Sequence, residues 1–563
     1  MPPTSVCPQS SLHLRRRYLH IPVRNQAPAM RLTFSRSGQH VTALDLAPGT
    51  RDDHDWIATL DLAAWVGQTF DVAVDNSEDV DQLIAQWASS DEPAALANDP
   101  RRPLLHFTAP TGWINDPNGL FYYRGRYHLF YQHNPVGREW GNMHWGHAVS
   151  RDLVHWRPLG DKLHPDATGT MFSGCAVVDH DNITGLQTSD IHPPICLFYT
   201  AAGKMAQHGV HFTQRLAYSL DAGESWQKHD GPAIVPTITA ENRDPKIFFH
   251  QPTARWVMVL YLEKRDELQW FEILTSIDLL HWQPASRVSL PGTGECGDLF
   301  KLPVQGRPDE SRWIFWSADG VYLIGDFDGV QFISNQKPLY AYNGNTPGPP
   351  SGAYAAQRFD NLPNKRCIQL AWLRSNFPAE MSFNQQLTLP VEVSLKSTNH
   401  GMRLAFKPVN ELDVAFETSL PIPGVLSDAK TWEQRIAGAM HLSARVHLDG
   451  NGQIRLSVGP LQIVIDAHRI HAGEFVADLP SMNFTIDLYI DTASVEIFAC
   501  DGVVYMPLFR TPQAAESDLL KIEVLGSSTL VDHLILYRTR QTRRPGRSEA
   551  SPFGAVGEIV VNS

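Results

Sequence analysis

The sequence predicts an all-β fold built around a β-propeller, and two features of the chain support this. Short runs of alternating apolar and polar residues, separated by turn-forming residues, recur along the chain, as is typical of β-strands. A repeated turn with a serine, an aspartate two residues later and a terminal tryptophan follows such strands in Ser150–Trp156, Ser219–Trp226 and Ser276–Trp282. The aspartates lie 69 and then 57 residues apart, which fits four-stranded blades with variable loops. An array of β-sandwiches with recurrent turns is the alternative.

A small β domain is predicted at the N-terminal side of the propeller, over residues 12–95. Apolar and polar residues alternate from Tyr18 to about Val74, and the segment Asp79–Trp87 fits either a strand or a short helix. The segment Ser89–Pro103 is rich in Ser, Asp, Ala and Pro, so we interpret it as a linker to a propeller at 103–392.

A β-sandwich is predicted after the propeller, over residues 393–540. Short strand-like runs such as Ile454–Val458 and Leu461–Ile465 are typical of such a domain. The last segment, 541–563, is expected to be a loosely attached tail in which Gly557–Val561 could add one edge strand.

Composition and charge favour a soluble globular protein with an uncharged partner. The chain has 563 residues, of which 43% are hydrophobic and 19% charged, and 47 basic against 60 acidic residues give a formal charge of −13. This charge disfavours binding to nucleic acid or anionic membranes, and no apolar stretch approaches membrane-spanning length. The six cysteines form no spacing motif, and the basic segment Leu14–Tyr18 interrupts any apolar leader, so free thiols and a cytoplasmic location are expected. The sequence does not predict the oligomeric state.

The segment Trp113–Gly119 is the first of three acidic motifs that each precede an aromatic-rich strand. It holds Asp116 between amides and an indole. Pro117 biases Asp116 toward an extended conformation, and Asn118-Gly119 predicts a hairpin turn with the acid at its mouth. A plain turn between two strands is the alternative.

The other two motifs are Glu241–Lys246, which contains Asp244, and Gly294–Phe300, which contains Glu295. Glycoside hydrolysis needs such carboxyl groups: one protonated for the leaving oxygen and one ionised to attack or stabilise the reacting carbon. A third can bind sugar hydroxyls. Three acids spread over such a length of chain are brought together more easily by a radial fold than by a row of sandwiches.

These motifs resemble, in the same order, those of glycoside hydrolase family 32, the fructan-cleaving enzymes that include invertases, inulinases and levanases. Further matches are Tyr131–Pro135, Trp140–Ala148, Phe172–Gly174, Val495–Phe498 and Asp501-Gly502. The resemblance implies a five-bladed propeller with a companion β-sandwich. It also implies a retaining mechanism with Asp116 as nucleophile, Glu295 as acid/base and Asp244 as transition-state stabiliser.

The resemblance and the residue types together suggest a set of substrate-binding residues: Trp113, Asn115, Gln132, Trp140, Phe172, Ser173, Arg243 and Trp372. The aromatic members could wall a sugar ring and the polar ones could bind hydroxyls, although in a chain with 15 tryptophans any one of them can be core filler. Arg243 would point away from Asp244 on a regular strand, so a structural ion pair on the far side is an equal alternative.

We expect no metal and no cofactor. His144 and His147 are three residues apart on a predicted strand, which puts their rings on opposite faces. Cys296 has no identifiable histidine partner, and strand alternation would turn it away from the neighbouring acid, so we interpret it as a packing residue.

Departures from the common family pattern concern the substrate. Gly297 replaces the usual proline and is expected to loosen the loop under Glu295, while Phe383–Glu392 lacks the usual Pro-Arg-Glu ending. That segment, with Trp372 and Arg374, could line outer subsites. The leading hypothesis is exo-acting release of fructose from levan or inulin, with sucrose also cleaved. Fructosyl transfer or endo cleavage on the same scaffold is the alternative, and a non-catalytic fructan-binding protein is a weaker one.

Overall fold

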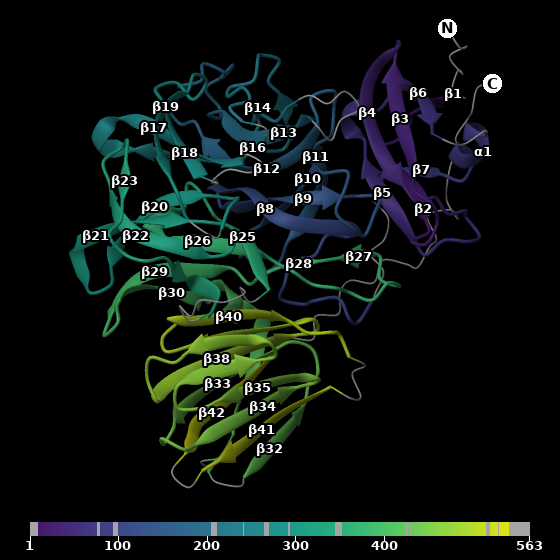
Figure 1. Cartoon of the computed structure of the whole chain (residues 1–563). Helices are drawn as coiled ribbons and strands as arrows, with labels where there is room; N and C mark the ends of the chain where they lie inside the picture. Colours follow the sequence, from purple (N-terminus) through teal and green to yellow (C-terminus); the bar gives the residue numbers. More distant parts are fainter. Residues whose placement is uncertain are drawn as a thin grey trace.

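Strands make up nearly all the regular structure of the protein (Figure 1). The computed structural model describes residues 9–75, 79–93, 99–203, 211–239, 241–263, 270–290, 293–343, 352–422, 426–427, 430–513, 518–526 and 529–539. The predicted all-β class, with a propeller and a sandwich, is confirmed. The described 3₁₀ turns are Ala63–Trp65, Gln251–Thr253, Ala341–Asn343, Pro363–Lys365 and Asn410–Ala415.

The propeller consists of five antiparallel blades in chain order. The first has β8 (Gly112–Tyr123), β9 (Arg126–Asn134), β10 (His144–Ser150) and β11 (Arg157–Leu163). The second has β12 (Thr170–Val178), β13 (Ile195–Ala202), β14 (Thr213–Ser219) and β15 (Gln227–Lys228). The third has β16 (Glu241–His250), β17 (Arg255–Glu263), β18 (Trp270–Ser276) and β19 (Gln283–Val288).

The fourth and fifth blades form one continuous sheet. The fourth has β20 (Asp298–Val304), β21 (Arg307–Trp316), β22 (Val321–Phe327) and β23 (Phe332–Ile333), with β24 (Leu339–Tyr340) beside β22. The fifth has β25 (Ala353–Arg358), β26 (Ile368–Leu373), β28 (Gln386–Leu387), β29 (Val391–Thr398) and β30 (Gly401–Pro408). A parallel contact between Val304 and Leu395 joins them. The expected domain boundary at 392/393 therefore falls inside β29, a propeller strand.

The repeated turn predicted from the sequence joins the third and fourth strands of the first three blades. In the first blade, Asp152 Oδ1 accepts hydrogen bonds from the Ser150 hydroxyl at 3.0 Å and the His155 N–H at 2.8 Å. The Trp156 indole donates to the Leu153 carbonyl at 3.1 Å. The other two segments repeat these bonds, so the prediction is confirmed. An aspartate and a serine thus close each turn by satisfying its backbone N–H groups.

The N-terminal strands form two small sheets beside the first blade (Figure 1). One contains β1 (Gln9–His13), β6 (Thr69–Val74), β3 (Met30–Arg36) and β4 (Gln39–Leu46), and the other β5 (Trp56–Asp61), β2 (Tyr18–Val23) and β7 (Ala88–Ser90). The ambiguous segment is helical: α1 (Val80–Ala85) begins after Asp79, whose carboxylate caps the Gln82 N–H. Strand β7 includes the first residues of the expected linker.

The C-terminal strands form a sandwich of two six-stranded sheets. The sheet nearer the propeller in Figure 1 contains β31 (Phe416–Pro421), β42 (Leu530–Thr539), β33 (Met440–His447), β38 (Asn483–Asp491), β39 (Ser494–Ala499) and β40 (Val504–Phe509). The other contains β32 (Thr431–Arg435), β41 (Leu519–Leu525), β34 (Gln453–Val458), β35 (Leu461–Ile465), β36 (Arg469–Ala472) and β37 (Phe475–Asp478). Strands β34 and β35 confirm two predicted strands. The edge strand expected at Gly557–Val561 lies outside the described residues.

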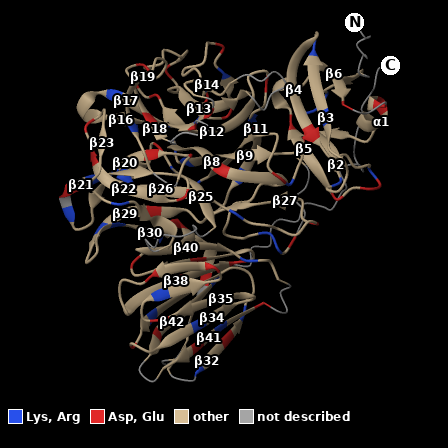
Figure 2. Ribbon diagram, viewed as in Figure 1, with Lys and Arg blue, Asp and Glu red and all other residues tan. Residues whose placement is uncertain are grey.

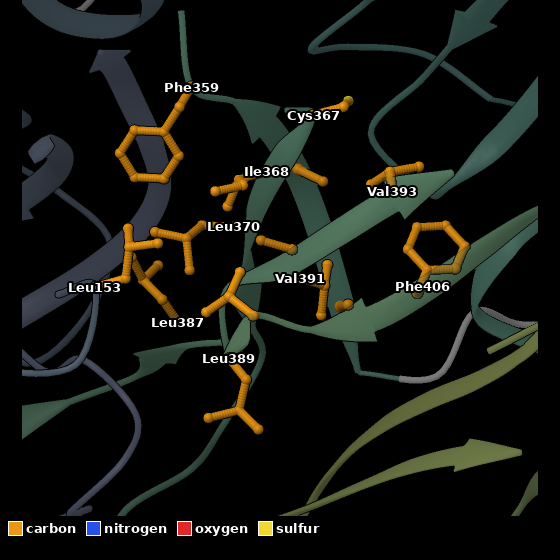
Figure 3. Close-up of a cluster of buried hydrophobic side chains, with 14 of the residues drawn as sticks. Leu153, Phe359, Cys367, Ile368, Leu370, Leu387, Leu389, Val391, Val393 and Phe406 are labelled. Atoms are coloured by element: carbon orange, nitrogen blue, oxygen red, sulfur yellow. The ribbon is translucent and has the colours of Figure 1, made fainter. Parts of the chain in front are cut away.

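The ring closes between the fifth blade and the first. Strand β27 (Phe383–Asn384) pairs in parallel with β8, so that Phe383 lies opposite Gly112 and Asn384 opposite Trp113. Apolar side chains from the last blade, including Ile368, Leu370 and Leu387, gather beside Leu153 of the first blade (Figure 3). Burial of this cluster stabilises the closure together with the short pairing.

A buried charged cluster joins the propeller to the sandwich. The His106 imidazole lies 2.9 Å from Asp491 and 3.0 Å from Glu496, and all three side chains are fully buried. Asp491 also accepts from the Leu105 N–H, and Glu496 from the Leu389 N–H, both at 2.8 Å. Burial lowers the pKa of His106, but its hydrogen bonds to the two carboxylates outweigh this and raise the pKa to about 9. The two bodies therefore share one ionic network.

Charged residues of both signs are mixed over the sheets, whereas the thiols of the described residues are mostly buried. Lys and Arg are interspersed with Asp and Glu over the sheets in Figure 2. Five cysteines among the described residues are free, and four of these are buried. In the parts of the chain that the structure describes, no helix is long and apolar enough to cross a membrane.

Candidate active site

The three predicted acids come together from three different blades. Asp116 lies on β8 and Asp244 on β16, the first strands of their blades, while Glu295 lies just before β20. Strand β12 of the second blade contacts both β8 and β16, so these first strands surround one centre. Cys296 contacts two of the acids: its thiol is 3.7 Å from Asp116 Oδ2, and its N–H donates to Asp244 Oδ2 at 3.3 Å.

Bulges in β8 bring Asp116 to this centre. The pairing with β9 shifts register between Ile114 and Pro117 and again between Asn118 and Phe121. The predicted turn at Asn118-Gly119 is therefore wrong, because β8 continues through it and the chain reverses at Arg124-Gly125, where φ is 48° and 79°. Bulges of this kind redirect side chains and are frequent beside active sites.

Neighbouring polar groups fix the Asp116 carboxylate. The Ser173 hydroxyl donates to Oδ2 at 2.6 Å, and the Asn115 amide donates to Oδ1 at 3.1 Å. The Trp113 indole in turn donates to Asn115 at 3.1 Å, which holds that amide in place. Burial raises the pKa of Asp116 to about 6, against the lowering effect of the Ser173 and Asn115 bonds. The group is therefore mostly ionised at neutral pH and only weakly solvated.

Asp244 occupies a strained backbone position. Its φ is +65°, and β16 shifts register against β17 between Arg243 and Lys246. A hydrogen bond at 3.0 Å from its N–H to the Thr200 hydroxyl holds this conformation. Burial raises the pKa of Asp244, while the Arg243 charge opposes the shift.

The same bulge excludes the alternative in which Arg243 points away from the acids. Its Nε and Nη2 atoms donate to Glu295 Oε1 at 3.0 and 2.7 Å, and its Nε lies 3.9 Å from Asp244. Regular alternation would separate adjacent side chains, but the irregular backbone puts both on one side. The guanidinium also bonds Glu241 and Glu263. Arg243 thus neutralises part of a strongly acidic site.

The Glu295 carboxyl is held from two directions and remains reachable. Arg243 bonds Oε1, the Tyr354 hydroxyl bonds Oε2, and 34% of the side chain is exposed. Glu295 and Cys296 have φ values of +59° and +43°, so they lie in an irregular loop rather than a strand. Strand alternation, from which Cys296 was expected to face away from Glu295, therefore does not apply there, and the Cys296 thiol lies beside Asp116.

Gly297 allows the loop under Glu295 to approach the third blade closely. A Cβ at this position would lie 2.6 Å from Phe271 and 2.9 Å from Val259. The loop therefore packs directly on the third blade, and only glycine fits such a close approach.

A family comparison agrees with this geometry. The family model described as "Glycosyl hydrolases family 32 N-terminal domain" matches residues 106–408, which contain all three acids and the five blades. The chain belongs to glycoside hydrolase family 32.

The curated relatives of this family 32 protein include enzymes named levanase and exo-inulinase. It is 38% identical over 343 residues to a levanase from Bacillus subtilis, an alignment covering 56% of this chain and 48% of the levanase. It is 32% identical over 385 residues to an extracellular exo-inulinase from Meyerozyma guilliermondii, covering 63% of this chain and 70% of that protein. The chain thus spans about half the length of the Bacillus levanase.

Solved structures of other proteins share the fold. An exo-inulinase from Aspergillus awamori superposes with a TM-score of 0.70 at 24% identity, covering 79% of this chain and 99% of that one. A family 32 β-fructofuranosidase from Bombyx mori gives a TM-score of 0.63 at 23% identity, with coverages of 78% and 95%. At these identities the likeness supports the fold.

The aromatic binding candidates of the family 32 site form two pairs. Trp113 and Trp372 meet edge to face with ring centroids 6.0 Å apart, although they come from the first and fifth blades. Trp140 and Phe172 meet similarly at 5.7 Å, and Trp140 is 48% exposed. Each pair thus combines residues far apart in sequence. The apolar faces of such aromatic rings can pack against the apolar face of a sugar ring.

Gln132 lies deeper than the other polar candidates. It is buried, and its amide is 3.0 Å from the side chain of Asn118, which in turn lies 3.3 Å from the Ser173 hydroxyl. Gln132 therefore touches the site's polar network, and its direct contact with a sugar stays a prediction.

Sequence reasoning missed several residues around Glu295 and Asp244. Thr200, Glu263 and Tyr354 all bond a member of the acidic site or its arginine. None of them lies in one of the three acidic motifs. Each reaches the site from another strand, β13, β17 or β25. Only the three-dimensional arrangement identifies them.

The two histidines considered as metal ligands have separate surroundings. His144 donates from Nδ1 to the backbone carbonyl of Asn142, while His147 stacks on Phe130 at 4.1 Å and pairs with His128. In the described ranges, no group of three or more His, Cys, Asp or Glu side chains is arranged to hold a metal ion.

Proposed function

We propose that this protein is a retaining β-fructosidase that hydrolyses terminal non-reducing β-D-fructofuranosyl residues of levan, inulin and sucrose. The observation that carries the proposal is the convergence of Asp116, Asp244 and Glu295 around Cys296. Asp116 is held by neutral donors, and Asp244 is buried. Glu295 is partly exposed and is oriented by a tyrosine and an arginine. Retaining glycosidases need such differentiated carboxyl groups.

In the first step, protonated Glu295 gives its proton to the glycosidic oxygen while Asp116 attacks C2 of the fructosyl residue. The C2–O bond breaks, the leaving sugar departs as an alcohol, and a fructosyl ester forms on Asp116. Ser173 and Asn115 hold the attacking carboxylate at fixed orientation, which lowers the entropic cost of reaching the transition state.

In the second step, ionised Glu295 takes a proton from water, and the resulting hydroxide equivalent attacks C2. The ester bond breaks, fructose leaves, and Asp116 and Glu295 return to their starting states. Asp244, beside Arg243, accepts hydrogen bonds from the O3 and O4 hydroxyls, which strengthen as positive charge develops on the sugar.

Substrate preference rests on relatives as well as on the site. The relatives are named levanase and exo-inulinase, which supports fructans as the substrate class. Exo action on levan or inulin, and cleavage of sucrose, are part of the proposal. A cytoplasmic location stays a prediction, and the exo-inulinase relatives are named extracellular.

The test is a time course of products from sucrose, inulin and levan, each with wild type and Glu295→Gln. Fructose as the sole early product from a polymer, with a loss of about 10²- to 10⁴-fold in the variant, supports the proposal. Early oligosaccharides would indicate endo cleavage or transfer instead. Absence of turnover of every β-fructoside by folded wild type would refute the hydrolase and favour a fructan-binding protein.

A further inference from the structure

We propose that Asn142 is a positioning residue, through which the N-terminal domain holds Trp140 in place against the fructosyl unit of the substrate. This inference rests on the function proposed above. Trp140 and Asn142 lie in the segment between β9 and β10 of the first blade, beside the N-terminal sheets (Figure 1). The N-terminal domain thereby acts on substrate binding without supplying a residue that touches the sugar.

The Asn142 side chain docks on the edge of an N-terminal sheet. Among the described strands β4 is the last of its sheet, so the outer N–H and C=O groups of β4 need partners other than a strand. Asn142 Oδ1 accepts a hydrogen bond from the Asp45 N–H, and Asn142 Nδ2 donates to the Asp45 carbonyl, both at 2.8 Å. One side-chain amide thus takes the place of a neighbouring strand at Asp45.

Two asparagines hold the backbone on either side of Trp140. Asn142 has a φ of +47°, a left-handed conformation that asparagine adopts more readily than most residues. Its Nδ2 also donates to Asn134 Oδ1 at 3.1 Å, and Asn134 Nδ2 donates to the Glu139 carbonyl at 2.9 Å. Glu139 comes directly before Trp140, so the paired amides fix the chain just before and just after the indole.

The start of the same segment is anchored by Val136 and Arg138. Val136 is 1% exposed and belongs to the apolar core of the N-terminal domain, although it follows a propeller strand in the sequence. Arg138 donates to the carbonyls of Phe377 and Pro378 at 3.1 and 2.9 Å, which ties the segment to the chain after β26. Trp140 therefore lies between an apolar and a polar anchor, and both are contacts with the N-terminal domain.

Trp140 depends on such support because its ring is 48% exposed. Its edge-to-face neighbour Phe172 precedes Ser173, whose hydroxyl bonds Asp116, so the indole stands on the Asp116 side of the site, where the fructosyl unit binds. An indole on a loose segment would have to be ordered by the substrate, and this ordering would reduce the affinity. A fixed indole binds the sugar in the ground state and the transition state alike, so it acts on KM.

Asn142→Gly tests the proposal, because glycine adopts the φ of +47° easily and only the amide is lost. On sucrose, inulin and methyl β-D-fructofuranoside, which share the fructosyl unit, we expect KM to rise about 3- to 10-fold with kcat within about twofold. Trp140→Ala should raise KM about 10- to 30-fold. The double variant should match Trp140→Ala within about twofold, since Asn142 acts through Trp140.

Arg17→Ala is the matched control. Arg17 Nη2 donates to the Leu159 carbonyl on β11 at 3.2 Å, so it also joins the N-terminal domain to the first blade, but through another strand. This variant should lower the thermal midpoint and leave KM unchanged on all three substrates. Hydrogen exchange over residues 135–143 should become faster in Asn142→Gly and stay as in wild type in Arg17→Ala.

Four results would overturn the positioning role. They are an unchanged KM in Asn142→Gly, effects of Asn142→Gly and Trp140→Ala that multiply in the double variant, a rise in KM that spares the methyl glycoside, and an equal rise in Arg17→Ala. Lack of wild-type activity on every fructoside would instead refute the proposed function, and the inference with it.

Discussion

Cys296 links the two buried aspartates, with its thiol 3.7 Å from Asp116 and its N–H 3.3 Å from Asp244. Burial raises the pKa of the Cys296 thiol, and the surrounding carboxylates raise it further, so the thiol stays neutral. A neutral thiol can lie between acids without adding charge. It donates weakly to Asp116 and is no nucleophile in this setting.

Replacing Cys296 should shift the pH dependence of activity. Its bond to Asp116 stabilises the carboxylate, so Cys296→Ala should raise the pKa of Asp116 and move the acid limb of kcat/KM to higher pH. Cys296→Ser keeps a donor and should move the limb less. The measurement is kcat/KM from pH 4 to 8 for the three proteins. An unchanged limb in the alanine variant would show that the thiol does not stabilise the nucleophile.

Removing the Asp116 charge should stabilise the fold at neutral pH. The pKa of Asp116 is raised to about 6 in the folded protein, so its ionisation costs stability as pH rises from about 4 through 6. Asp116→Asn should therefore raise the thermal midpoint at pH 7, with a smaller gain at pH 5, while abolishing turnover. Scanning calorimetry at both pH values measures this. A lower midpoint at pH 7 would contradict the pKa direction.

Arg243 should be irreplaceable by lysine. Its guanidinium bonds Glu295 through two nitrogens and contacts Glu263 through one of them, a geometry that an ammonium cannot reproduce. Arg243→Lys should lower kcat/KM by about tenfold or more, on methyl β-D-fructofuranoside as well as on sucrose. Loss confined to sucrose would place Arg243 in leaving-group binding instead. Circular dichroism checks that the variant is folded.

The His106 cluster should make the contact between propeller and sandwich sensitive to alkaline pH. The pKa of His106 is raised to about 9, so its stabilising effect is complete below about 6.5 and is lost as pH rises through 9. His106→Ala leaves Asp491 and Glu496 buried without their partner and should cost about 3–5 kcal/mol.

The control for this prediction is His441→Ala, since His441 pairs with Asp487 at 2.8 Å in a more exposed place on the sandwich. It should cost far less. Thermal unfolding from pH 6 to 10 compares the variants with wild type. An equal alkaline loss of stability in wild type and His106→Ala would assign the effect to other groups.

Local sequence patterns predicted much of the fold and the acids. The Ser-Asp-Trp turns were recognisable because each closes with its own short-range hydrogen bonds. The three acids stood in motifs rich in turn residues and aromatics. Strands β34 and β35 followed from simple alternation.

Backbone irregularity explains the wrong predictions. Strict strand alternation gave a far-side ion pair as an equal alternative for Arg243 and turned Cys296 away from Glu295, but bulges and positive φ values at Asp244 and Glu295 direct both side chains toward the site. The turn expected at Asn118-Gly119 was absorbed into a bulged strand. The hydrogen bond from Tyr354 to Glu295 depends on the tertiary arrangement of the fifth blade, so the local sequence does not indicate it. Local pattern carries no information on such placements.

The two-residue pairing of β27 with β8 affects the order in which the parts of the molecule unfold on heating. Asn384 pairs with Trp113, only three positions before Asp116, so separation of the last blade from the first would displace Asp116 while the sandwich is still intact. Opening the ring here breaks this short pairing and exposes the apolar cluster around Leu153, while both sheets of the sandwich stay paired. Activity should then be lost on warming before the bulk of the β-structure, and rapid cooling should restore it.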